Sequence, residues 1–287
     1  MIKRACLLVC LLLLPRLALA EAVQMEVRSG IRAGAEYLHG QPAKPAVLLL
    51  HGFLQTHNFP TLASLARGLH DAGYTTLTPT LSLGIPGRKQ SLACEALHRH
   101  TLEDDVSEIA LWVNWLKSHG HRDIVLAGHS FGSMQLLAYL SGKYDPAIRG
   151  YVGASLVETQ MGEQPRARLI ESLKKKIKQD DRGPVSGRLS FCKKFFATPS
   201  SLLSYARWDQ SRTLAALRAY HGEKLLIMGG ADDRLGHRWL KTLKDTGVRL
   251  IVVEGASHFL DGEHEFDLLD GVLSLLVKLS PSPRGGE

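Results

Sequence analysis

The chain contains 287 residues, of which 45% are hydrophobic and 22% charged, and its formal net charge at pH 7 is +7. This length is sufficient for one large domain with a sizeable hydrophobic core. The charge balance is only mildly basic and comes with no recognition motif for nucleic acid, so we expect no nucleic-acid partner.

Residues 1–20 have the pattern of a secretory signal peptide. Lys3 and Arg4 precede an apolar run over residues 5–14 that is too short to span a bilayer, and Ala18-Leu19-Ala20 is a small-x-small cleavage site. An uncleaved anchor is the alternative, but a proline and an arginine directly after the apolar run disfavour it. We predict cleavage after Ala20 and a secreted or periplasmic protein. Loss of the three basic residues of this segment lowers the formal net charge to +4.

Strand and helix patterns alternate from about residue 45, which predicts an α/β fold with a mostly parallel central sheet flanked by helices. Short apolar runs predict buried strands, and apolar residues at every third or fourth position predict helices. The predicted strands are 46–50, 75–81, 124–127, 148–154, 225–228 and 250–253, and the predicted helices are 61–72, 102–117, 134–140 and 266–279. Residues 23–38 are expected to add two antiparallel edge strands.

The domain is predicted to cover residues 21–280 and to be followed by a flexible tail, 281–287, which is rich in proline and glycine. Within it, residues 160–208 interrupt the alternation, and a connection this long between strands is uncommon. We expect this insertion to form a cap over the site. Its basic run, Lys174 to Lys178, is a candidate for peripheral contact with a membrane surface or an anionic head group, with a solvated helix face as the alternative.

The sequence Gly128-His129-Ser130-Phe131-Gly132 lies between a predicted strand and a predicted helix. A G-x-S-x-G motif in this setting is typical of a sharp turn that lifts a serine hydroxyl out of the sheet toward a base. The two glycines allow the strand and the helix to pack closely around Ser130. We therefore predict that Ser130 is a nucleophile.

A base and an acid are expected further along the chain, after the last two predicted strands. His258 follows the final strand and is the candidate base. The adjacent Asp232 and Asp233 follow the penultimate strand, and we prefer Asp233 as the acid because of its spacing from Gly230; Asp232 is the alternative. Glu158 is a third and more distant candidate.

Two backbone N–H groups are needed to stabilise the oxyanion that forms during acyl transfer. The residue after the nucleophile, Phe131, provides one of them. The loop after the strand 46–50 has the sequence His51-Gly52-Phe53, and we predict that Phe53 provides the other.

Together these motifs resemble the α/β-hydrolase superfamily, in the branch of monoacylglycerol lipases and serine aminopeptidase-like hydrolases. The matching segments are His51 to Phe53, Gly128 to Gly132, Gly230 to Asp233 and Gly255 to His258, which span most of the predicted domain. The resemblance implies the fold and a Ser-Asp-His triad but no particular substrate.

Of the four cysteines, Cys94 and Cys192 remain after cleavage. In an oxidising compartment two thiols suggest one disulfide, and two free thiols are the alternative. The segment from Cys94 to His100 also resembles a subgroup of exported, uncharacterised bacterial hydrolases with a second cysteine in the cap, which favours the Cys94–Cys192 pair.

The sequence thus predicts an exported serine hydrolase that cleaves a carboxylic ester through an acyl-enzyme, acting on a small-molecule or lipid-like acyl substrate. This chemistry requires no metal and no cofactor. Acyl transfer to an alcohol and aminopeptidase-like amide hydrolysis on the same triad are the alternatives. A non-catalytic binding protein is disfavoured because the serine, the acid and the histidine are all present.

Overall fold

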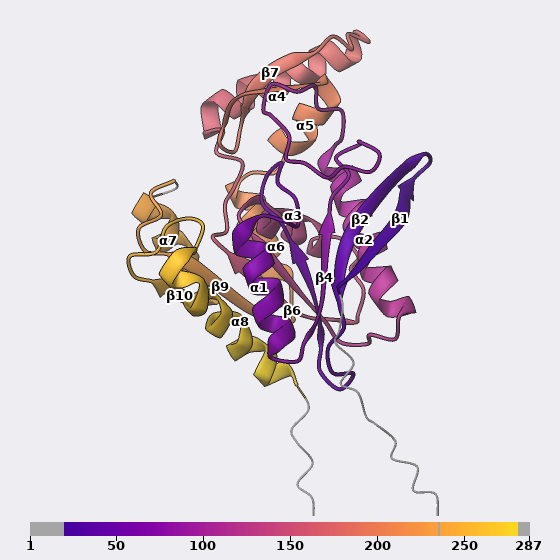
Figure 1. Ribbon diagram of the computed structural model, residues 1–287. Helices are drawn as coiled ribbons and strands as arrows, with labels where there is room; N and C mark the ends of the chain where they lie inside the picture. Colours follow the sequence, from indigo (N-terminus) through magenta and orange to yellow (C-terminus); the bar gives the residue numbers. More distant parts are fainter. Residues whose placement is uncertain (1–19, 235, 281–287) are drawn as a thin grey trace, which may run out of the picture.

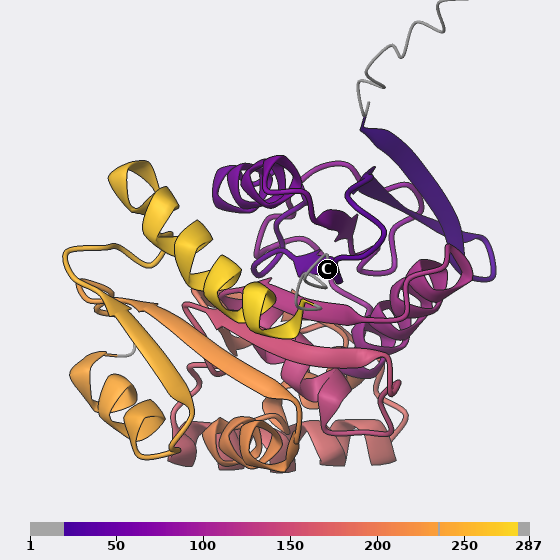
Figure 2. The same cartoon turned by 90° about the horizontal axis from the view of Figure 1, so that it is seen from below.

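The computed structural model describes residues 20–234 and 236–280. They form an eight-stranded sheet in the order β1-β2-β4-β3-β5-β6-β9-β10 with helices on both faces (Figures 1 and 2). The strands are β1 Glu21–Arg28, β2 Ile31–Leu38, β3 Ala46–Leu50, β4 Thr75–Thr80, β5 Ile124–His129, β6 Ile148–Ala154, β9 Glu223–Gly229 and β10 Arg249–Val253. The predicted tail and all of the predicted signal peptide except Ala20 lie outside the described residues.

The direction of the strands agrees with the prediction. β4, β3, β5, β6, β9 and β10 run parallel to their neighbours, whereas β1 and β2 form an antiparallel hairpin that joins the edge of β4. Each predicted strand is present within two residues of its predicted bounds. The α/β fold with a mostly parallel sheet is therefore confirmed.

The sheet separates two hydrophobic layers. Side chains alternate along β3, so that Val47 and Leu49 join one layer while Leu48 and Leu50 join the other. The helices α1 (Pro60–Asp71) and α8 (Glu265–Leu279) cover the first face, as Figure 2 shows. The helices α2 (Leu102–Ser118), α3 (Phe131–Leu140) and α6 (Gln210–Ala219) cover the second. Within the described ranges, no helix combines the length and the apolarity needed to cross a membrane.

The segment between β6 and α6 folds above the carboxyl ends of the parallel strands (Figure 1). It contains α4 (Glu163–Lys178), the antiparallel hairpin of β7 (Val185–Leu189) and β8 (Cys192–Ala197), and α5 (Pro199–Ala206). None of these elements was predicted from the sequence, nor were α6 and the short helix α7 (Gly236–Lys244) beside β10. We call residues 160–208 the cap.

Candidate active site

Ser130 lies on the sharp turn between β5 and α3, as the motif predicted. Its backbone has φ 57° and ψ −123°, a conformation that is costly for a residue with a Cβ atom. The turn is held by a hydrogen bond from the Ser130 amide to the Ala154 carbonyl at 2.8 Å. A Cβ atom at Gly132 would clash with the carbonyl oxygen of His51, so the motif glycine at this position allows α3 to approach the loop after β3.

Ser130, His258 and Asp232 form a chain of hydrogen bonds at the carboxyl ends of β5, β10 and β9. The Ser130 hydroxyl lies 2.8 Å from Nε2 of His258, and Nδ1 of His258 lies 2.6 Å from Oδ2 of Asp232. The His258 and Asp232 side chains are only 4% and 7% exposed. In the tautomer that these partners favour, Nδ1–H donates to the carboxylate and Nε2 accepts from the serine.

The preference for Asp233 is wrong, because the structure brings Asp232 to His258 instead. β9 ends at Gly229, and the turn that follows points Asp232 toward His258. Asp233 is exposed to solvent. Glu158 lies in a different polar cavity with Arg166 and Asp209, beneath the cap.

The Asp232 carboxylate is held in its charged form. Burial alone would raise its pKa, but the hydrogen bond and charge of His258, together with the Arg234 amide and guanidinium, outweigh burial and lower the pKa below the usual value. The Arg234 amide donates to Oδ1 at 3.1 Å, so both carboxylate oxygens have partners.

His129 supports the backbone of the candidate base. Its Nε2 atom donates to the carbonyl oxygen of His258 at 3.0 Å. Burial and the neighbouring His258 lower the pKa of His129 to about 4, so its ring is neutral at neutral pH. The ring also stacks on Phe59 at a centroid distance of 6.0 Å. His129 therefore fixes the position of His258 without adding a charge.

The two predicted oxyanion donors lie on adjacent segments. Phe131 is the first residue of α3, where a backbone N–H has no partner inside the helix. The Phe53 ring contacts the Phe131 ring at a centroid distance of 4.5 Å. A Cβ atom at Gly52 would lie 3.4 Å from the Cβ atom of Ser130, which places the loop after β3 directly against the serine.

The buried side chain of His51 connects this loop to the end of β4 by hydrogen bonds. Its Nε2 atom accepts a hydrogen bond from the Leu81 amide at 3.1 Å, so Nδ1 carries the proton and donates to the Gly52 carbonyl at 2.8 Å. Burial lowers the pKa of His51 to about 3, and the charge of Arg88 acts in the same direction. The ring is therefore neutral and serves as a fixed donor and acceptor.

Sequence reasoning missed Arg88, which is buried beside this loop. Its guanidinium donates to the carbonyl oxygens of Gln55 at 2.8 Å, Leu81 at 2.7 Å and Gln90 at 2.9 Å, and it lies 3.3 Å from Nε2 of His51. Burial lowers its pKa to about 10, so the group stays charged at neutral pH. No motif marks such a residue, because its acceptors are mainly backbone carbonyls.

Comparison with known proteins agrees with this geometry. A model of the Alpha/beta hydrolase family matches residues 47–269, which is most of the chain. The chain belongs to the α/β hydrolase family. Among curated proteins, no sequence matches it significantly.

Solved structures of other α/β proteins share the fold of this hydrolase. Est1E from Butyrivibrio proteoclasticus has a TM-score of 0.62 at 17% identity, over 91% of this chain and 99% of its own. A malate-bound thermophilic esterase from Thermogutta terrifontis also has a TM-score of 0.62 at 17% identity, over 91% and 100%. A monoacylglycerol lipase from Paleococcus ferrophilus has a TM-score of 0.63 at 17% identity, over 86% and 98%. Identities this low establish the fold alone. The predicted superfamily is confirmed by the family model that matches residues 47–269.

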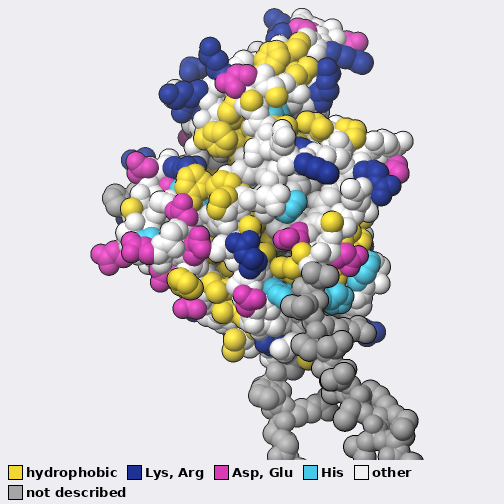
Figure 3. Space-filling view, viewed as in Figure 1, with side chains coloured by type: hydrophobic (Ala, Val, Ile, Leu, Met, Phe, Trp, Pro, Cys, Tyr) yellow, Lys and Arg dark blue, Asp and Glu magenta, His cyan; other side chains and the backbone are white. Residues whose placement is uncertain are grey.

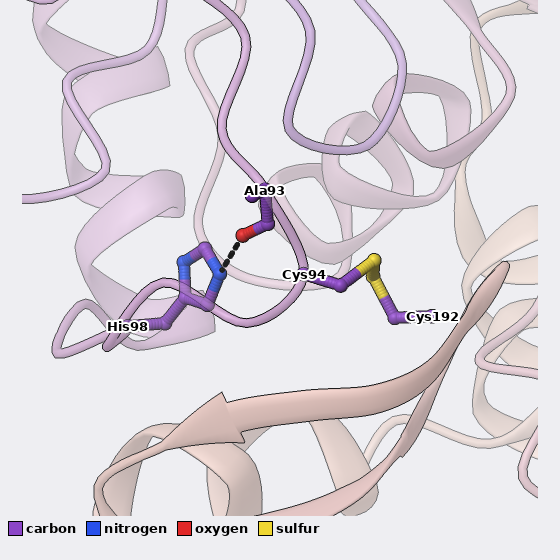
Figure 4. Close-up of a disulfide and its surroundings, with 4 residues drawn as sticks. All are labelled: Ala93, Cys94, His98 and Cys192. Atoms are coloured by element: carbon purple, nitrogen blue, oxygen red, sulfur yellow. Dashed lines mark hydrogen bonds between the residues drawn. A yellow bond between two sulfur atoms is a disulfide. The ribbon is translucent and has the colours of Figure 1, made fainter.

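The cap of the hydrolase is joined to the loop after β4 by a disulfide between Cys94 and Cys192 (Figure 4). The two Cα atoms are 5.6 Å apart. The same segment pairs with β8 through the backbone, because the Phe196 amide donates to the Cys94 carbonyl at 3.0 Å and the His98 amide donates to the Phe196 carbonyl at 2.9 Å. Nε2 of His98 also donates to the carbonyl of Ala93 at 3.1 Å (Figure 4).

Aromatic side chains of the cap reach the candidate site. The Phe195 and Phe191 rings lie 5.6 and 5.7 Å from the Phe53 ring, measured between centroids. Phe195 is buried, whereas Phe191 is 53% exposed at the tip of the β7–β8 hairpin. The hairpin therefore covers the oxyanion loop of the hydrolase with an apolar surface that continues to solvent.

Proposed function

We propose that this hydrolase cleaves carboxylic esters through an acyl-enzyme, with Ser130 as nucleophile, His258 as base and Asp232 as the orienting acid. The hydrogen-bonded chain from Ser130 through His258 to Asp232 carries the proposal. It supplies the three roles that acyl transfer requires, at hydrogen-bond distances and out of bulk water.

The geometry supports the following sequence of steps. Nε2 of His258 takes the Ser130 proton as Oγ attacks the ester carbonyl, and the Asp232 carboxylate stabilises the imidazolium that results. The amides of Phe53 and Phe131 hold the oxyanion of the tetrahedral intermediate. His258 then protonates the departing alcohol. A water molecule, activated by the same histidine, releases the acid and restores Ser130.

The surroundings of Ser130 favour an apolar acyl group. The rings of Phe53, Phe131 and the two cap phenylalanines leave few polar partners for the acyl part of a substrate. One structural neighbour is named as an esterase and another as a monoacylglycerol lipase, which supports an ester as the substrate. We therefore place the natural substrate among esters with an aliphatic or aromatic acyl group.

The pattern of residues 1–20 and the Cys94–Cys192 disulfide support action outside the cytoplasm, because disulfides persist in oxidising compartments. Cell fractionation followed by N-terminal sequencing tests this part of the proposal. Glu21 at the N-terminus of an exported protein is the expected result, and a chain found in the cytoplasm with Met1 intact would contradict it.

A panel of p-nitrophenyl esters of graded acyl length, run beside aminoacyl nitroanilides and with and without an alcohol acceptor, tests the reaction class. We expect ester hydrolysis without acceptor, labelling of the wild type by a fluorophosphonate probe, and neither in Ser130→Ala, with activity at least about 10⁴-fold lower. Faster cleavage of the nitroanilides would indicate an amidase. Turnover that occurs only when the alcohol acceptor is present would indicate an acyltransferase. Labelling that persists in Ser130→Ala would exclude Ser130 as nucleophile.

A further inference from the structure

The net charge of the chain is concentrated in the cap. Residues 160–208 contain eleven lysine and arginine residues and four acids, a surplus of seven positive charges, which equals the formal net charge of the whole chain. The remaining residues are balanced between acids and bases. A surface potential of one sign on one part of a protein steers partners of the opposite sign toward it.

Most acids of the cap are already neutralised by cap cations. Glu171 pairs with Lys174 at 2.8 Å, Asp181 with Lys176 at 2.6 Å, and Asp180 with Arg182 at 2.8 Å. The predicted basic run on α4 therefore contributes less free charge than its sequence suggests. Among the described residues, the exposed cap cations without an ion pair are Arg168, Lys175, Lys178, Arg188, Lys193, Lys194 and Arg207.

Three of these cations and two exposed phenylalanines lie on the β7–β8 hairpin and its tip. The inner side packs on the cap helices through Leu189, Phe195 and the close approach of Gly187 to Leu202. Phe191 at the tip is 53% exposed and Phe196 on β8 is 36% exposed, and Figure 3 shows hydrophobic side chains on the cap surrounded by lysines and arginines. We define the hairpin face as the set Arg188, Phe191, Lys193, Lys194 and Phe196.

The hairpin face adjoins the candidate site through one of its phenylalanines. Phe191 contacts Phe53, whose amide is the proposed oxyanion donor, while about half of the Phe191 surface faces solvent. A partner that covers the hairpin face therefore lies close to the loop that carries Phe53.

We propose that the hairpin face docks the protein on a lipid surface that contains anionic lipids. Such a surface offers negative head groups for Arg188, Lys193 and Lys194 and an apolar layer just below them for the phenylalanine rings. Phenylalanine has no hydrogen-bonding group, so an exposed ring gains most from a partner with an apolar phase. The docking rests on the charge and exposure of the cap and stands whether or not the proposed ester hydrolysis is correct.

Vesicle sedimentation with the purified protein tests the docking. Neutral phosphatidylcholine vesicles are compared with vesicles that contain 30% phosphatidylglycerol, at about 0.05 M and 0.5 M salt. We expect binding to the anionic vesicles that weakens strongly at high salt, because exposed charges are screened. Since all variants keep the same residues 1–20, any binding through that basic and apolar segment contributes equally to the wild type and to each variant.

Two variants locate the contact. The triple substitution R188Q/K193Q/K194Q should weaken partitioning onto anionic vesicles about a hundredfold, because each lost cation weakens it roughly fivefold. The matched control K241Q/K244Q/R249Q removes three exposed cations outside the cap, on α7 and β10, and should change partitioning by less than about threefold. Hydrolysis of a soluble ester and thermal unfolding should match the wild type in both.

A third variant separates charge from apolar insertion. F191S should weaken binding about tenfold at low salt and keep its salt dependence, since the three cations remain. Equal loss in the two triple variants would overturn the proposal, as would equal binding to neutral and anionic vesicles. A protein that ignores anionic vesicles but binds a soluble polyanion such as a DNA oligonucleotide would show that the hairpin face recognises another class of partner, which also overturns it.

Discussion

The Asp232 carboxylate uses one oxygen for His258 and the other for the backbone of its own loop. Oδ2 lies 2.6 Å from Nδ1 of His258, and Oδ1 accepts from the Arg234 amide at 3.1 Å. This arrangement fixes the plane of the carboxylate and keeps the Nδ1–H tautomer of the imidazole. Nε2 is then free to accept the Ser130 proton.

Asparagine substitutions separate the two neighbouring aspartates. Asp232→Asn should lower kcat on a p-nitrophenyl ester by about 10³- to 10⁴-fold, because an amide can donate to Nδ1 and stabilise the wrong tautomer. Asp233→Asn changes an exposed side chain and should stay within about threefold of the wild type. Steady-state kinetics with both variants decides the assignment, and the reverse ranking would return the acid to Asp233.

The sequence located the strand-turn-helix of Ser130 and the histidine after the last strand because both follow from local backbone requirements. The positions of Gly128, Ser130 and Gly132 are set by contacts within one turn and with the loop after β3. The choice between Asp232 and Asp233 depends on the conformation of the turn after β9, and two adjacent aspartates in a turn cannot be distinguished by residue type.

The insertion of a cap was predicted, but the elements inside it and the role of Arg88 were not, for different reasons. The β7–β8 hairpin is short and contains a register shift between Gly187 and Leu189, which breaks the alternation that identifies a strand. Arg88 donates hydrogen bonds to the backbone carbonyls of Gln55, Leu81 and Gln90. Every residue has a backbone carbonyl, so the residue types in the sequence do not identify these acceptors.

Loss of the Arg88 guanidinium should disorder the oxyanion loop. Arg88→Met keeps most of the apolar stem but leaves the buried carbonyls of Gln55 and Leu81 without this donor. We expect kcat to fall about 10- to 100-fold with a smaller change in KM, since an oxyanion donor acts mainly in the transition state. Kinetics well below the unfolding temperature measure this effect without a contribution from unfolded protein.

Two further variants control for a purely structural role of Arg88. Arg88→Lys retains the charge but only a single donor centre, so it should recover part of kcat. Arg99→Met alters an exposed arginine of the same loop and should behave as the wild type. If Arg88→Met lowered the unfolding temperature but left kcat unchanged, Arg88 would serve stability and not the oxyanion loop.

Asp105 is a buried acid on α2 that has no contact with the candidate triad among its hydrogen bonds. Its Oδ2 atom accepts from Gln135 Nε2 at 2.7 Å and from the Tyr205 hydroxyl. Burial raises its pKa to about 8, which the two hydrogen bonds offset only in part. The folded protein thus keeps a proton that the unfolded chain loses near the ordinary pKa of 3.8.

Stability should therefore fall as pH rises from about 4 to about 8 because of Asp105, and level off above that range. Linkage gives at most about 1.4 kcal/mol per pH unit for one proton. Asp105→Asn mimics the protonated acid, so the difference in unfolding free energy between wild type and variant should shrink with rising pH and reverse in favour of the variant. Urea unfolding at several pH values measures it. The control Glu103→Gln replaces an exposed acid of the same helical turn and should show the pH dependence of the wild type. If Asp105→Asn also showed the pH dependence of the wild type, the raised pKa of Asp105 would be refuted.

The Cys94–Cys192 disulfide should stabilise the protein more than it controls the site. The two cysteines are 98 residues apart in sequence, and closing a loop of this length restricts the unfolded chain by about 4–5 kcal/mol in the chain-entropy model. Reduction, or the double variant C94S/C192S, should lower the unfolding temperature by about 10 °C.

The cap is also held by backbone pairing between the Cys94–His98 segment and β8, so ester hydrolysis at 25 °C should remain within about threefold of the wild type. Mass spectrometry of the non-reduced protein should yield the linked pair of peptides. Free alkylation of both thiols in the denatured, non-reduced protein would show that the bond is absent, and a large loss of activity at unchanged stability would show that it positions the cap over Ser130.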